Sequence, residues 1–91
     1  MIEKIINRIK YRLDEENKIA EVIKKRGYKG EDTITIPDAI VLKKVSYNVT
    51  SIGESAFEGC SSLTSITIPK SVTSIGVHAF NGCISLETIK Y

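Results

Sequence analysis

The sequence contains no tryptophan and little cysteine, histidine or proline, with two, one and two residues of these types. Two cysteines and one histidine are too few for a disulfide framework, and too few for a closed zinc site without carboxylate help. No run of about 18 apolar residues occurs, so we expect no membrane span. The segment from Met1 to Arg8 interrupts its apolar residues with charges, so we expect no signal peptide in this chain.

Sequence patterns typical of catalysis are absent as well. The chain has no glycine-rich phosphate loop, no paired carboxylates in an apolar frame and no Gly-x-Ser-x-Gly elbow. We therefore predict a protein that is not an enzyme, with no catalytic residue, no metal site and no cofactor.

Charge is nearly balanced over the 91 residues, at a net +2. The only basic triplet, Lys24 to Arg26, is flanked by Glu21 and by Glu31 and Asp32, and nucleic-acid binding normally needs a clear cationic excess. We interpret the triplet as a solvated face and expect no nucleic-acid partner. A chain of this length forms one domain.

An internal repeat of 23 residues governs the C-terminal half. Residues 49–68 return as residues 72–91, with 12 of 20 positions identical. The unchanged residues include the apolar ones that one coil of a solenoid buries against the next, whereas pairs such as Ser55 and His78 differ freely. Because that position accepts both side chains, we expect His78 to be exposed.

Each repeat contains two short extended pieces and a corner. Residues 65–68 alternate polar and apolar side chains before Pro69, as in a strand, and residues 49–52 form a second extended piece. Residues 56–60 are too short for a full helix and predict one helical or 3-10 turn. Residues 33–37 form a partial earlier copy, and nine extra residues before Val49 predict an excursion that pairs back.

The string Val-Thr-Ser-Ile-Gly-x-x-Ala-Phe-x-Gly-Cys-x-Ser-Leu, together with Ile-x-Ile-Pro, resembles the BspA-type (treponemal-type) leucine-rich repeat family over residues 33–91. The resemblance implies a mainly β fold, a short leucine-rich-repeat solenoid of about two and a half repeats with an N-terminal β-hairpin cap. It also implies a non-enzymatic module for protein interaction or adhesion, secreted or at a cell surface. The alternative function is a capping or self-assembly fragment of a longer array with no foreign ligand.

Two structures are open for residues 2–23. The apolar positions fit one face of a helix, but residues 9–13 and 19–23 alternate in polarity around the polar turn 14–17. The first coil of a solenoid needs a cover, and this need favours the hairpin. The expected organisation is one domain, with the cap at 1–32, a partial repeat with its excursion at 33–48, a repeat at 49–71 and an incomplete repeat at 72–91.

Two sets of residues are candidates for an interface with a protein partner. Alternation places polar side chains on the outer face of the predicted sheet: Thr35, Ser65, Thr67, Thr88 and Lys90. The last strand, with Leu86, Ile89 and Tyr91, is expected to leave an open edge that pairs with a second copy as a homodimer. Tyrosines are good interface anchors where they are exposed: Tyr11, Tyr28, Tyr47 and Tyr91.

Equivalent positions of the two repeats predict stacked side chains. Phe57 and Phe80 are expected to stack at the corner as a buried pair. Cys60 and Cys83 are expected one above the other as buried thiols, with a disulfide as the alternative.

Overall fold

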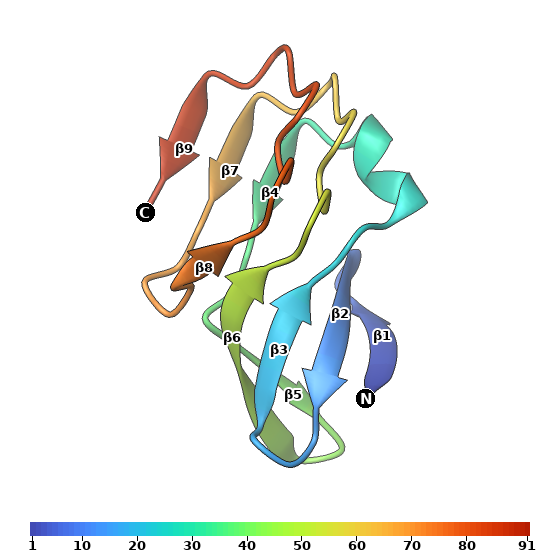
Figure 1. The fold of residues 1–91 in the computed structure, drawn as a ribbon, viewed down its shortest axis with the longest axis vertical. Helices are drawn as coiled ribbons and strands as arrows, with labels where there is room; N and C mark the ends of the chain where they lie inside the picture. The colour runs from blue at the N-terminus through green and yellow to red at the C-terminus, as the bar shows by residue number, and fades with distance from the viewer.

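Short strands dominate the computed structural model, which describes residues 1–91 apart from the side chain of Lys29. The elements in chain order are β1 (Ile2–Ile6), β2 (Ile9–Asp14), β3 (Ile19–Val22), the 3-10 helix η1 (Arg26–Gly30), β4 (Thr33–Thr35), β5 (Ala39–Leu42), β6 (Val45–Ile52), β7 (Ser65–Thr67), β8 (Ser74–Ile75) and β9 (Thr88–Lys90). One sheet has the order β1-β2-β3-β6-β5 with β8 also paired to β6, and the other has the order β4-β7-β9 (Figure 1). The predicted mainly β solenoid is confirmed.

Residues 2–23 form strands, which decides between the two structures open from the sequence. β2 and β3 make the expected hairpin, and β1 adds a third antiparallel strand through a turn in which Asn7 and Arg8 have φ of 50° and 73°. The β2–β3 turn is held by Asp14, whose carboxylate accepts the backbone N–H groups of Glu16 and Asn17 at 3.0 and 3.1 Å. The Asn17 side-chain amide also donates to this carboxylate at 2.8 Å, and this bond, followed by the backbone bonds, lowers the pKa of Asp14.

The N-terminal strands join the repeats through a parallel pairing of β3 with β6, which places Ala20 beside Val49 and Val22 beside Ile52. The excursion predicted before the first full repeat is present. In it, β5 pairs antiparallel with β6 across a turn in which Lys43 and Lys44 have φ of 51° and 68°.

Each coil passes through both sheets and turns a corner between them (Figure 1). The corner after β6 consists of single turns closed by the i+3 to i hydrogen bonds of a 3-10 helix, such as Cys60 N–H to the Phe57 carbonyl at 3.1 Å. The next coil hydrogen-bonds to this corner, because the N–H of Phe57 donates to the carbonyl of Ala79 at 2.8 Å. The stacking of successive coils therefore continues through the corner.

A ladder of three aromatic rings runs along the corner inside the core. Phe57 and Phe80 stack as predicted, although Phe80 is half-buried rather than buried. Tyr28 of η1 adds a third ring that the sequence did not reveal, with its centroid 4.9 Å from that of Phe57. The Tyr28 hydroxyl accepts the N–H of Lys10 at 2.8 Å and donates to the carbonyl of Ile23 at 3.1 Å. We call Tyr28, Phe57 and Phe80 the aromatic ladder. It joins the N-terminal cap to both repeats.

Candidate interaction surface

The polar side chains predicted from the repeat lie on one face of the sheet β4-β7-β9. Its parallel register aligns Thr33, Ser65 and Thr88 in one row. A second row joins Thr35, Thr67 and Lys90. We call these six residues the hydroxyl face. The structure thus brings together all five residues expected on this face and adds Thr33, which the alternation of residues 33–36 could have indicated.

The opposite side of the same sheet packs against the core and so sets the orientation of the hydroxyl face. Ile34, Ile66 and Ile89 form the row between the two polar rows, and Ile34 and Ile66 are buried. Because successive side chains of a strand point to opposite sides, burial of Ile34 and Ile66 turns the hydroxyls to the outer side of the sheet. There the hydroxyl residues of β4 and β9 are exposed and those of β7 are half-buried. In the described part of the chain, no side-chain hydrogen bond occupies the hydroxyls of the five Ser and Thr residues. They can therefore donate to or accept from a partner.

The β4 side of the hydroxyl face ends in a small pocket that the sequence did not predict. Its volume is about 190 Å³, and its lining includes Thr33, Thr35 and the pair Arg8 and Glu31. Arg8 Nη1 lies 3.6 Å from Glu31 Oε1, and the Arg8 side chain is exposed. The turn between β1 and β2 therefore sets a charged rim beside the threonines.

The β9 edge of the sheet carries the apolar residues expected at the open edge. Ile89 is 41% exposed and Tyr91 is 80% exposed, whereas Ile66, the equivalent of Ile89 one coil earlier, is completely buried. Leu86 is half-buried and packs against the core. β9 pairs with β7 on one side.

Of the four tyrosines considered as interface anchors, only Tyr91 is exposed. Tyr11, Tyr28 and Tyr47 are buried and so do not meet the condition of exposure that an interface anchor requires. Burial raises the pKa of Tyr11 and of Tyr28 to about 12. These rings are part of the hydrophobic core, because each points inward from its strand or turn.

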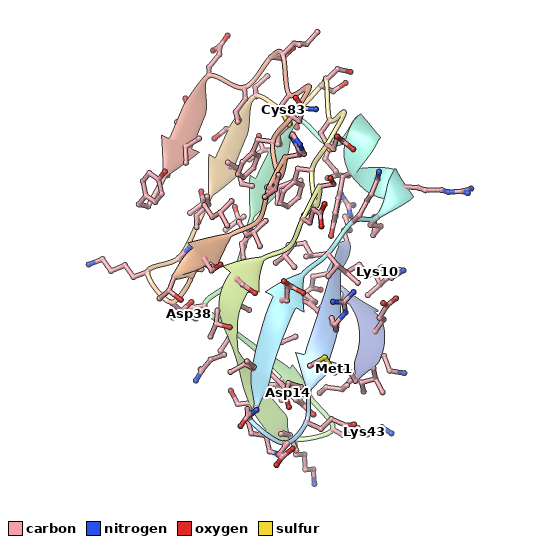
Figure 2. All side chains as sticks on the ribbon, viewed as in Figure 1. Met1, Lys10, Asp14, Asp38, Lys43 and Cys83 are labelled. Carbon is pink, nitrogen blue, oxygen red and sulfur yellow. The ribbon has the colours of Figure 1, made fainter. Side chains whose placement is uncertain are left out.

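The cysteines and the histidine lie near the corner, away from the hydroxyl face. Both cysteines are thiols, as expected, and Cys60 is buried, but Cys83 is half-buried rather than buried as predicted. The Cys83 thiol donates to the carbonyl of Phe57 at 3.1 Å, and partial burial raises its pKa. His78 is exposed in a left-handed conformation with φ of 60°, which matches the 57° of Ser55 in the preceding coil. Figure 2 labels Cys83 among the coil loops.

The described residues contain no group of three or more His, Cys, Asp and Glu side chains arranged to hold a metal ion. Among them there is also no helix with the length and hydropathy needed to cross a membrane.

Known structures share this fold. A leucine-rich repeat protein from Bacteroides ovatus is 37% identical, with a TM-score of 0.84 over 94% of this chain and 22% of that one. A leucine-rich cell surface protein from Faecalibacterium prausnitzii is 32% identical, with a TM-score of 0.83 over 98% of this chain and 23% of that one. The leucine-rich repeat protein of T. pallidum is 27% identical, with a TM-score of 0.77, and the match covers 99% of this chain and 39% of that one.

The chain therefore spans less than half the length of these three relatives. A search of curated proteins found no significant match. A family model described as a BspA-type leucine-rich repeat region (6 copies) matches residues 32–91, which include every strand from β4 to β9. The chain belongs to the BspA-type leucine-rich repeat family.

Proposed function

We propose that the chain is a non-enzymatic protein-interaction module that binds a protein partner through the hydroxyl face. The observation that carries the proposal is the regular array of hydroxyls without intramolecular partners, on residues that are exposed on β4 and β9 and half-buried on β7. Leucine-rich repeat folds typically mediate protein interactions, which supports the same function. A flat array of hydroxyls contributes many small hydrogen bonds, and the Arg8 and Glu31 rim adds charge that orients the partner.

The test combines a binding screen with surface mapping. The purified chain is screened against a panel of extracellular proteins, and each hit is measured again with Thr35→Arg and Thr67→Arg. The large charged side chain blocks close approach to the face, so we expect binding to fall at least about ten-fold. Ser61→Arg is the matched control, because Ser61 is exposed at a corner outside the face. Hits that bind both face variants as well as the original chain contradict the proposal.

The location of the protein belongs to the same proposal. BspA-type proteins are typically found on the surface or secreted, and the F. prausnitzii relative is a cell surface protein. We propose that this chain also acts outside the cell. Protease added to intact cells should then digest it, and complete protection until lysis would contradict an extracellular location.

Self-association is the second candidate function. The specific observation in its favour is the exposure of Ile89 and Tyr91 beside the unpaired edge of β9. Two copies that meet at this edge by two-fold symmetry would pair their β9 strands antiparallel. Sedimentation should show a dimer that Ile89→Lys converts to a monomer. Ile84→Lys is the control, because Ile84 is 84% exposed outside any strand. A chain that is monomeric at high micromolar concentration rules out this function.

A further inference from the structure

A second surface gathers positive charge beside the 3-10 helix η1. A pocket of about 560 Å³ is lined by Lys10, Lys24, Lys25 and Arg26, with Glu58 as its one carboxylate and Ile5 at its edge. Figure 2 shows Lys10 on the side of the molecule from which η1 projects. We call this the cationic pocket. Four cations face one anion here, although the net charge of the whole chain is only +2.

Contacts around the cationic pocket hold its charged groups in place. The Lys24 ammonium lies 3.7 Å from Glu58 Oε1, and the second oxygen of Glu58 accepts the Asn81 amide at 3.2 Å. The Lys25 ammonium lies 4.9 Å from the centroid of the Tyr28 ring, a cation–π contact on a ring that two hydrogen bonds fix. Part of the cost of ordering long side chains on binding has thus been met in the unbound protein.

Two of the four cations are not paired with a carboxylate and are therefore available to an anionic ligand. Lys10 is paired with Glu3 at 3.3 Å, and Lys24 is paired with Glu58. Lys25 and Arg26 have no carboxylate within ion-pair distance among the described side chains. The sequence-based interpretation of Lys24 to Arg26 as a solvated face fits the exposure of Lys24 and Arg26, whereas Lys25 is half-buried. The triplet also borders a pocket that the sequence did not show.

The surroundings decide which kind of anion fits the cationic pocket. The lining of a neighbouring hollow of about 540 Å³ has no cationic excess, because it contains three carboxylates and three cations: Glu3, Glu21, Glu54, Lys10, Arg12 and Lys24. A long polyanion, such as a nucleic acid or a sulfated glycan, would extend over this charge-balanced hollow and find no further cationic excess there. Tyr28 is buried and so offers no exposed ring on which bases could stack. Ile5, in contrast, is 60% exposed and offers an apolar contact.

We propose that the cationic pocket binds a short acidic segment of a partner protein, with carboxylates on Lys25 and Arg26 and an apolar side chain against Ile5. Short-range charge complementarity of this kind sets specificity and association rate. The pocket is separate from the hydroxyl face. A binding experiment that contradicts the role of one surface therefore does not contradict the role of the other.

The test uses the isotope-labelled chain and an acetylated, amidated peptide of sequence Glu-Glu-Leu-Glu-Glu. Peptide up to about 5 mM should shift the backbone amide signals of residues 24–28 and 56–60 in NMR spectra. Raising NaCl from about 20 mM to about 300 mM should weaken binding roughly ten-fold, because the charges lie near the surface. The double variant Lys25→Glu with Arg26→Glu should abolish the shifts.

The matched control is Lys43→Glu with Lys44→Glu, which reverses two exposed cations at the β5–β6 turn, outside the cationic pocket. It should bind the peptide as the original chain does, and circular dichroism should confirm that both double variants fold. Three results overturn the proposal: no shifts at the highest peptide concentration, equal loss of binding in the two double variants, or shifts at these amides with heparin but not with the peptide.

Discussion

Phe57 and Phe80 occupy the same position of successive repeats and stack with ring centroids 5.6 Å apart and ring planes inclined by 8°. Phe57 is completely buried between Tyr28 and Phe80, whereas Phe80 is half-buried, with Phe57 of the first repeat stacked on one of its faces. Phenylalanine at one repeat position is therefore buried to two different degrees in the same protein.

We expect Phe57→Ala to lower the free energy of unfolding by about 3–5 kcal/mol, because it empties the middle of the aromatic ladder. Phe80→Ala should cost less, since part of that ring is already in water. Urea denaturation of the two variants measures the difference. An unchanged midpoint for Phe57→Ala, or an equal loss in both variants, would contradict this account of the ladder.

The sequence predicts the repeated part of this fold well for a physical reason. Period-2 alternation and a second copy of the same residues give independent signals for β7 and β9, and both signals depend on local sequence. Tyr28 has no equivalent in a second copy, and its place in the ladder depends on the long-range pairing of β3 with β6. Neither periodicity nor repetition could reveal it. The same limit applies to Arg8, whose rim position depends on the β1–β2 turn.

The close approach of the two repeats at Gly76 gives a second prediction. A Cβ atom at this position would lie 2.5 Å from the backbone nitrogen of Glu54 and 2.7 Å from the carbonyl carbon of Gly53. Gly76→Ala must therefore push the coils apart, and we expect a loss of about 1–3 kcal/mol in urea denaturation. Gly30→Ala is the control, because a Cβ there meets nothing within 4 Å. Equal stability of the two variants would show that the coils can separate without loss.

Tyr28 predicts an alkaline loss of stability. Burial raises its pKa to about 12 in the folded chain, against an ordinary value near 10 when unfolded. Between these values the unfolded chain releases the proton and the folded chain keeps it, so the free energy of unfolding falls as pH rises from about 10 to about 12. Below pH 10 this contribution is complete.

The variant Tyr28→Phe isolates this contribution from that of Tyr11, whose pKa is also raised to about 12. The variant should lose about 1–3 kcal/mol at pH 8, because the N–H of Lys10 and the carbonyl of Ile23 lose their shared partner. From pH 10 to pH 12 its stability should fall less steeply than that of the original chain. Parallel stability curves over this range would show that Tyr28 ionises equally in both states.

The two thiols should react at different rates in the native protein. Cys60 is 1% exposed, and Cys83 is half-buried with a raised pKa, which reduces the reactive thiolate. With a thiol reagent followed by mass spectrometry, we expect slow labelling of Cys83, slower labelling of Cys60 and rapid labelling of both in urea. Cys60→Ser keeps one signal and identifies which thiol reacts first. Fast native labelling of Cys60 contradicts its burial, and a mass lower by two hydrogens would reveal a disulfide.

The last prediction concerns the organisation of the chain as one domain. The cap and the repeats share one hydrophobic core, in which Val22 of β3 lies beside Ile52 of β6 and Tyr28 contacts Phe57. Neither part can therefore unfold without exposing apolar surface of the other. Because small domains with one core unfold cooperatively, we expect a single transition.

Hydrogen exchange under native conditions tests this unity residue by residue. The amides of Leu13 in the cap and Ile66 in the first repeat should exchange with the same free energy of opening, and Phe57→Ala should lower both by the same amount. Amides of β9 should exchange faster, because that strand is exposed and pairs on one side. If Phe57→Ala lowers protection at Ile66 and leaves Leu13 unchanged, the cap unfolds on its own and the boundary near residue 32 separates two folding units.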